Sequence, residues 1–203
     1  MTGTHVHETP GGGGARTGLN EVMSFRDLSR AEAESFVTAW TGTWPRRREW
    51  LEQEGGPDLA PVDLSRDFVV RLDAWGRPRV RPPAEGGATI GERPMWADLA
   101  DNGDLHRYDP TSLWLVDAVA LAVGESVLAG ARGPSYGWAA GDHEGRRDAY
   151  YAQNWPVIRK GPEGPEFSPL WQCLVWASRI LNDSPPRGGL TGQYDRGVDP
   201  QEM

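Results

Sequence analysis

The sequence predicts an α+β fold in which three to four helices pack on a small, mainly antiparallel sheet. Segments with helical spacing of apolar residues are set apart from short strand-like runs, and no regular strand–helix–strand alternation is present. The length of 203 residues suits one domain with tails. Ten tryptophans can supply a core although only 38% of the residues are hydrophobic.

We expect a single domain over residues 24–182. Residues 1–20 contain a run of glycines and little that could be buried, so we expect a disordered tail there. Residues 183–203 are rich in turn formers and charges and lack hydrophobic periodicity, so we expect a second disordered tail.

Capping residues and spacing predict the first two helices. Ser29 followed by Glu32 fits a capping box, and apolar residues then recur at helical spacing as far as Trp44. Pro45 ends or kinks this helix because it lacks an amide hydrogen. A second helix is therefore expected from Pro45 to Glu54.

Residues 67–81 predict a hairpin. Its first half is a short run rich in strand-forming residues, residues 74–76 form the turn, and the second half alternates polar and apolar positions. Pro78 and Pro82 place this second strand at a sheet edge, because proline cannot donate a ladder hydrogen bond.

The strongest predicted helix spans residues 110–129. Asp109 is a favourable N-cap, Pro110 suits the first helical turn, and Gly130 suits the end. This segment is apolar nearly all round, which indicates burial on most sides. The remaining elements are strands over residues 135–140 and 149–159, the latter placed by Pro156 at an edge or bulge, and a closing helix from Ser168.

Composition excludes several classes of protein. No stretch approaches 18 uninterrupted apolar residues, and the N-terminus lacks a signal-peptide pattern, so we expect a cytoplasmic protein without a membrane span. The single cysteine, Cys173, excludes a disulfide framework and a cysteine-based zinc site. The net charge of −8 argues against general nucleic-acid binding and is compatible with a basic protein partner. No nucleotide, metal or hydrolase motif is present, so we expect no cofactor and no metal.

Tryptophan and arginine are the residues most typical of binding hot spots, and they cluster along the predicted hairpin. An edge strand there could recruit a partner protein by strand addition, whereas the alternative is that its basic residues only prevent aggregation and that the indoles belong to the core. The candidate partner-binding residues are Arg71, Trp75, Arg77, Arg79, Arg81 and Trp96.

A second candidate site is an acid/base cluster. Glu125 lies near the C-terminal end of the most apolar helix, where burial and the helix dipole both act on a carboxylate. His143 follows Asp142, and Tyr150 lies close in sequence. The alternatives are that Glu125 is exposed or pairs with an arginine, and that the segment around His143 is a solvated turn.

A longer stretch, from Trp114 to Leu181, resembles a group of small actinobacterial α+β domains of unknown function, some of accessory or immunity type. The resemblance rests on a buried helix that ends in Gly-Glu, a strand with an inward tryptophan, and the segments Asn154–Ile158 and Ser168–Leu170. Twenty of the 21 basic residues are arginine, which is typical of a high-GC genome. The resemblance implies a non-catalytic binding protein and carries no catalytic residue across.

Three functional hypotheses follow from these patterns. The first is a protein-binding domain of accessory or immunity type that holds or occludes a partner. The second is a small enzyme with a site around Glu125 and His143. The third is a structural subunit of a larger assembly, in which the tails order on binding.

Overall fold

The computed structural model describes residues 24–84, 92–100, 105–131, 136–142, 152–162, 164–184 and 188–199. Its α-helices are α1 (Arg30–Thr41), α2 (Trp44–Gly55), α3 (Arg66–Gly76), α4 (Pro110–Gly130), α5 (Pro169–Leu181) and α6 (Gly189–Val198). The antiparallel sheet has the order β1 (Tyr136–Ala140), β2 (Pro156–Lys160), β3 (Glu166–Phe167). The predicted α+β class is confirmed, with more helices than expected. The predicted tail over residues 1–20 lies outside the described residues.

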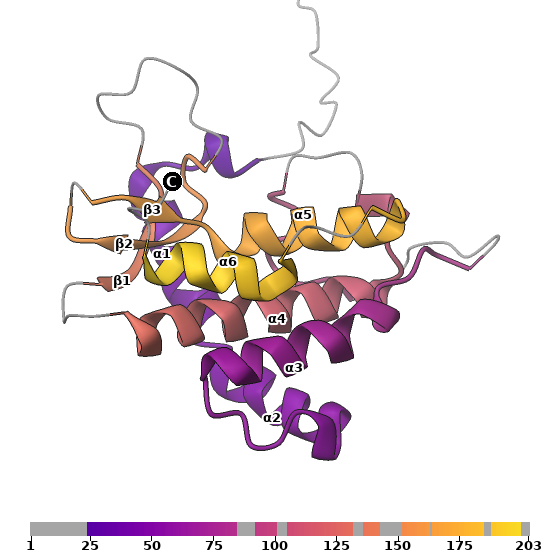
Figure 1. Ribbon diagram of the computed structural model, residues 1–203. Helices are drawn as coiled ribbons and strands as arrows, with labels where there is room; N and C mark the ends of the chain where they lie inside the picture. The colour runs from indigo at the N-terminus through magenta and orange to yellow at the C-terminus, as the bar shows by residue number, and fades with distance from the viewer. Residues whose placement is uncertain are drawn as a thin grey trace, which may run out of the picture.

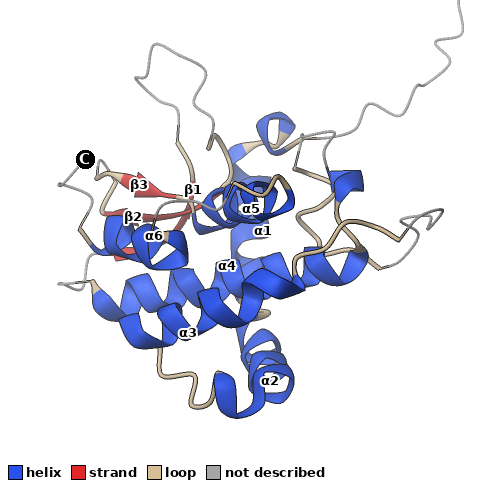
Figure 2. Cartoon of the chain, turned by 45° about the vertical axis from the view of Figure 1, so that its right-hand side comes forward, coloured by secondary structure: helices blue, strands red, loops and turns tan. Residues whose placement is uncertain are grey.

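Helix α4 is the centre of the molecule. It packs against α2, α3, α5 and α6, while α1 covers β1 and α5 covers β2 (Figure 1). The strands gather at one end of this helical body (Figure 2). The sheet therefore meets the helices at the C-terminal end of α4, and α2 and α3 occupy the side of α4 away from α5 (Figure 1).

The sequence of α4 explains its central place. Asp109 caps the helix by accepting a hydrogen bond from the Ser112 amide (2.7 Å), and Pro110 fills the first turn, as predicted. Nearly every side chain from Leu113 to Val127 is buried. By length and composition α4 could also cross a membrane, but it is mostly enclosed by other elements, as a core helix is.

The one fully buried acidic side chain of α4 joins three other segments. Asp117 is 1% exposed, and its carboxylate accepts hydrogen bonds from the indole nitrogens of Trp40 (2.7 Å) and Trp96 (2.9 Å) and from Nε of Arg47. The Arg47 guanidinium also stacks 4.4 Å from the ring centre of Trp114. A buried carboxylate is tolerated only when it is paired and hydrogen-bonded. Asp117 therefore fixes α1, α2 and the segment 92–100 on α4.

The hairpin predicted over residues 67–81 is wrong. These residues form α3 and a 3₁₀ turn, η3 (Arg77–Arg79). The Ser65 hydroxyl accepts a hydrogen bond from the Phe68 amide (3.0 Å) and so caps the helix. The strand-forming composition was misleading, because these residues also carry a helical repeat of apolar side chains that are buried in the core: Phe68, Val69, Leu72 and Trp75.

The sheet differs from the prediction in its order. Pro156 begins β2, which is the central strand and not an edge. Proline is tolerated there because it is the first residue of the strand, opposite Ala140 at the end of β1. Residues 152–155 form a turn, and residues 149–151 of the predicted strand lie outside the described residues.

The C-terminal region is not wholly a disordered tail, since residues 189–198 form α6. Arg66 on α3 holds α6 through paired hydrogen bonds to the Asp195 carboxylate (2.8 and 2.9 Å). The helix has a short buried repeat that was hidden among glycines and charges: Leu190, Gln193, Tyr194 and Gly197. The domain therefore extends beyond the predicted boundary at residue 182.

Replacing Asp117 tests whether its carboxylate holds the core together. We expect Asp117→Ala to lower the free energy of unfolding by about 3–5 kcal/mol, because it leaves the Arg47 charge and two indole donors unpaired. Urea unfolding followed by circular dichroism measures the change. Asp98→Ala is the matched control, since Asp98 is exposed and has no partner among the described residues. Equal losses in the two variants would contradict this role.

Replacing Gly189 tests the docking of α6. An added Cβ would collide with the Asp73 carboxylate, and Gly189 has φ +56°, so Gly189→Ala should cost about 1–3 kcal/mol. In the control, Gly137→Ala, the new carbon has no neighbour within 4 Å. A thermal melt compares the variants, and an unchanged Tm for Gly189→Ala would show that α6 does not stabilise the domain.

Candidate functional site

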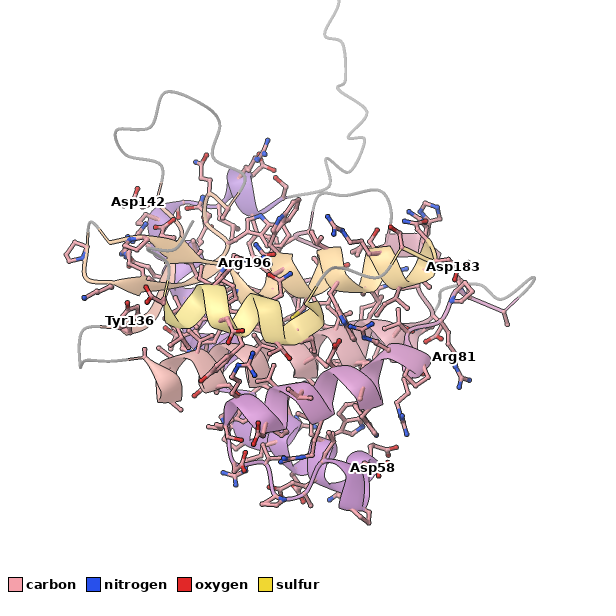
Figure 3. All side chains as sticks on the ribbon, viewed as in Figure 1. Asp58, Arg81, Tyr136, Asp142, Asp183 and Arg196 are labelled. Carbon is pink, nitrogen blue, oxygen red and sulfur yellow. The ribbon has the colours of Figure 1, made fainter. Side chains whose placement is uncertain are left out.

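Two adjoining hollows lie where α2, α3, η3 and the start of α4 meet. The first is about 250 Å³, the second about 340 Å³, and both are lined by Trp75 and Arg79. We call their lining the Arg–Trp face. Figure 3 labels Asp58 and Arg81, which lie on this side of the molecule. The first hollow is lined by Trp50, Glu54, Trp75, Arg79, Arg81, Asp109, Thr111 and Leu115, and the second by Asp58, Arg71, Ala74, Trp75 and Arg79.

Helix α3 positions the shared residues. Arg71, Trp75 and Arg79 recur every four residues along α3 and η3, so they project toward the same side. The Trp75 ring meets Trp50 edge-on at 6.1 Å. The Arg79 guanidinium stacks 4.4 Å from the centre of the Trp75 ring and donates a hydrogen bond to the Trp75 carbonyl (2.7 Å). These contacts hold the aromatic wall in one orientation.

The other two arginines of the Arg–Trp face are tethered differently. Arg71 donates to the Pro61 carbonyl (3.1 Å) and lies 3.8 Å from the Asp63 carboxylate. Hydrogen bonds from the Ser65 side chain and amide lower the pKa of Asp63, and the Arg71 charge adds to this. Arg81 is fixed through its backbone, because its amide donates to the Ser112 hydroxyl (2.8 Å) and its carbonyl accepts from the Asp109 amide (3.1 Å). Among the described residues its guanidinium has no acidic partner.

Two buried donors on this face lack acceptors among the described residues. They are the indole nitrogen of Trp75 and Nε of Arg71. Trp75 is only 5% exposed. Buried donors without acceptors are uncommon in folded proteins, so each needs an explanation.

The structure brings together four of the six predicted partner-binding residues: Arg71, Trp75, Arg79 and Arg81. They lie on α3, on η3 and in the segment just after η3, and not on the predicted hairpin. The assignment of Trp96 to a binding surface is wrong, because Trp96 is fully buried against Asp117. Arg77 lines neither hollow.

Arg77 instead forms an ion pair with Asp73. It donates from Nε (3.0 Å) and Nη2 (2.6 Å) to that carboxylate, and this hydrogen bonding raises the pKa of Arg77. The sequence did not identify Trp50, Glu54 and Asp109 as neighbours of this site. They come from α2 and the start of α4, and only tertiary packing joins them to α3.

The predicted acid/base cluster is described only in part. Glu125 accepts a hydrogen bond from the Trp138 indole (2.9 Å) and pairs with no arginine among the residues that the structure describes. The Asp142 carboxylate lies 3.4 Å from Arg30. His143 and Tyr150 lie outside the described residues, so this cluster stays a prediction.

A third hollow, of about 220 Å³, lies between α1 and the sheet, and Arg30, Trp138 and Arg159 line it. Its arginines are already matched by acids, since Arg159 lies 3.5 Å from the Glu166 carboxylate and Arg30 pairs with Glu34 at 2.7 Å. This hollow therefore offers little net charge to a ligand.

Neither a metal cluster nor a reactive thiol is found among the described residues. No group of three or more His, Cys, Asp or Glu side chains converges there. Cys173 is fully buried, and burial, helped by the negative charge of Asp73, raises the pKa of its thiol. A thiol in this setting is a core residue.

Comparison with known proteins gives one partial similarity. No family model matches the chain, and no solved structure matches it. The chain is similar to the holo-[acyl-carrier-protein] synthases of Mycobacterium ulcerans (strain Agy99) and Mycobacterium marinum (strain ATCC BAA-535 / M). Each is 32% identical over 74 residues, which is 36% of this chain and 50% of the relative. The chain thus spans about half the length of the curated relatives it matches.

Proposed function

We propose that this chain is a non-catalytic protein-binding domain, of accessory or immunity type, that holds or occludes a partner protein through the Arg–Trp face. The observation that carries the proposal is the convergence of Arg71, Trp75, Arg79 and Arg81 on two adjoining hollows. Arginine and tryptophan are the side chains most enriched in interface hot spots. Hollows beside them give a partner side chain a place to anchor.

Pre-organisation supports the same proposal. Trp75 is held between Trp50 and Arg79, so little side-chain entropy is lost when a partner contacts this wall. The exposed guanidinium of Arg81 lies beside the wall and can form new hydrogen bonds without first breaking an ion pair to a described residue.

Net charge bears on the rate of association. A charge of −8 favours encounter with a basic partner, and added salt would slow this encounter more than it would weaken the final complex. We place the interaction in the cytoplasm.

Capture of the partner tests the proposal. We expect the tagged full-length chain to retain one stoichiometric protein from its native host, identified by mass spectrometry. The double variant Arg79→Ala/Arg81→Ala should bind this protein about thirtyfold more weakly, which is the loss typical of a truncated hot spot. Binding of the purified pair by calorimetry gives the Kd.

Arg46→Ala is the matched control, because Arg46 is exposed on α2, lines neither hollow and has no partner among the described residues. It should bind as tightly as the wild type. If the double variant binds equally well, the Arg–Trp face is not the contact. If many copies of several proteins are retained, the chain is a subunit of a larger assembly.

The similarity to holo-[acyl-carrier-protein] synthases favours a second candidate, which is catalytic. If this catalytic candidate is correct, the chain converts an acyl carrier protein to its holo form under conditions in which the Mycobacterium marinum enzyme does so. Intact-protein mass spectrometry detects the conversion. Under the binding proposal we expect no mass change with this chain while the mycobacterial enzyme, as positive control, gives complete conversion.

A further inference from the structure

The described core repeats one arrangement in which a carboxylate joins a tryptophan and an arginine. Asp117 accepts from two indoles and from Arg47. Asp73 accepts from the indole nitrogen of Trp176 (2.7 Å) and from Nε and Nη2 of Arg77. We call each such group a Trp–carboxylate–Arg node. In both nodes the carboxylate satisfies an indole donor and balances a guanidinium charge.

On the Arg–Trp face the same two donors occur together without a carboxylate. Among the described residues, Trp75 is the one tryptophan whose buried indole nitrogen has no acceptor. The described partners of Arg79 are neutral, being the carbonyl and the ring of Trp75. Arg79 therefore forms no ion pair with a described carboxylate, although the protein contains 29 acidic residues and Glu54 and Asp109 line the first hollow with it.

The second hollow has more donors than acceptors. Arg71, which also lines it, has an Nε atom without an acceptor, and its nearest carboxylate, that of Asp63, is 3.8 Å away. Asp58 is the one acidic residue in the lining, and it has no hydrogen bond to Arg71, Trp75 or Arg79 among those described. A ligand that completes this hollow must supply acceptor oxygens and negative charge.

We propose that the second hollow receives the carboxylate of an aspartate or glutamate side chain from the partner protein, which completes a third Trp–carboxylate–Arg node with Trp75 and Arg79. This inference rests on the proposed function and names the chemistry of the contact. A partner that is basic overall still presents single acidic residues, and one of them anchors here.

The order of contacts follows from exposure. The indole nitrogen of Trp75 is covered, whereas Arg79 is exposed. The incoming carboxylate therefore meets the Arg79 guanidinium first, whose planar fork matches a carboxylate with two parallel hydrogen bonds.

Tryptophan indole signals in ¹H–¹⁵N NMR spectra of the full chain test the proposal. The probe is N-acetyl-glutamate α-amide, which carries one side-chain carboxylate, and its neutral match is N-acetyl-glutamine α-amide. We expect the first to move the Trp75 indole proton downfield in a saturable manner, and the second to leave it in place. Trp75→Phe identifies the signal by removing it.

Variants separate this node from general charge effects. Arg79→Ala should abolish the shift of the Trp75 signal, and Arg46→Ala should keep it, although both remove one exposed arginine. Unmoved signals of the other indoles report that each variant is folded.

Three results would overturn the proposal: the Trp75 indole signal does not shift with the carboxylate probe, it shifts equally with the amide probe, or it shifts with inorganic phosphate and not with the carboxylate probe. The last result would indicate a free-phosphate site. If the captured partner still depends on Arg79 and Arg81 but the carboxylate probe has no effect, the node fails while the proposed function stands. If the probe binds but no partner is captured, the proposed function fails instead.

Discussion

The buried carboxylate of Asp117 is the constraint on which the rest of the structure depends. It lies on the most enclosed helix and is almost fully buried, so its charge must be met by protein donors. Those donors are 70 and 77 residues away in sequence for Arg47 and Trp40, and 21 residues away for Trp96. One carboxylate therefore joins the first two helices and the segment 92–100 to α4.

The same chemistry explains the tryptophan content. An indole buries a large apolar surface and still carries one donor, so it can pack in the core and neutralise the cost of a buried carboxylate at once. Trp138 does this with Glu125, and Trp176 with Asp73. A chain with modest aliphatic content thereby obtains a core whose polar groups fix the relative positions of its helices.

The sequence predicted those parts of the fold that have local signals. The capping box at Ser29, the N-cap at Asp109 and the apolar run that follows it placed α4 and the start of α1 correctly, although α1 ends at Thr41 and Pro45 lies in the first turn of α2. The prediction was wrong at α3, because strand-forming residues and Pro78 indicated a hairpin where a helical repeat of apolar residues continues as far as Trp75. For the candidate site, the sequence indicated the arginine and tryptophan residues. It did not indicate the hollows, because these form where α2, α3 and α4 pack together, and no local sequence pattern predicts that packing.

The length of α4 separates the two ends of the domain. Its 21 residues span about 30 Å at 1.5 Å per residue. Asp109 and Thr111, at its start, belong to the first hollow, whereas Gly130, at its end, lies against Val198 at the close of α6. A linker joined after α6 would thus start at the end of the domain opposite the hollows. The domain can therefore be attached to a surface or a fusion partner through α6 with the Arg–Trp face directed outward.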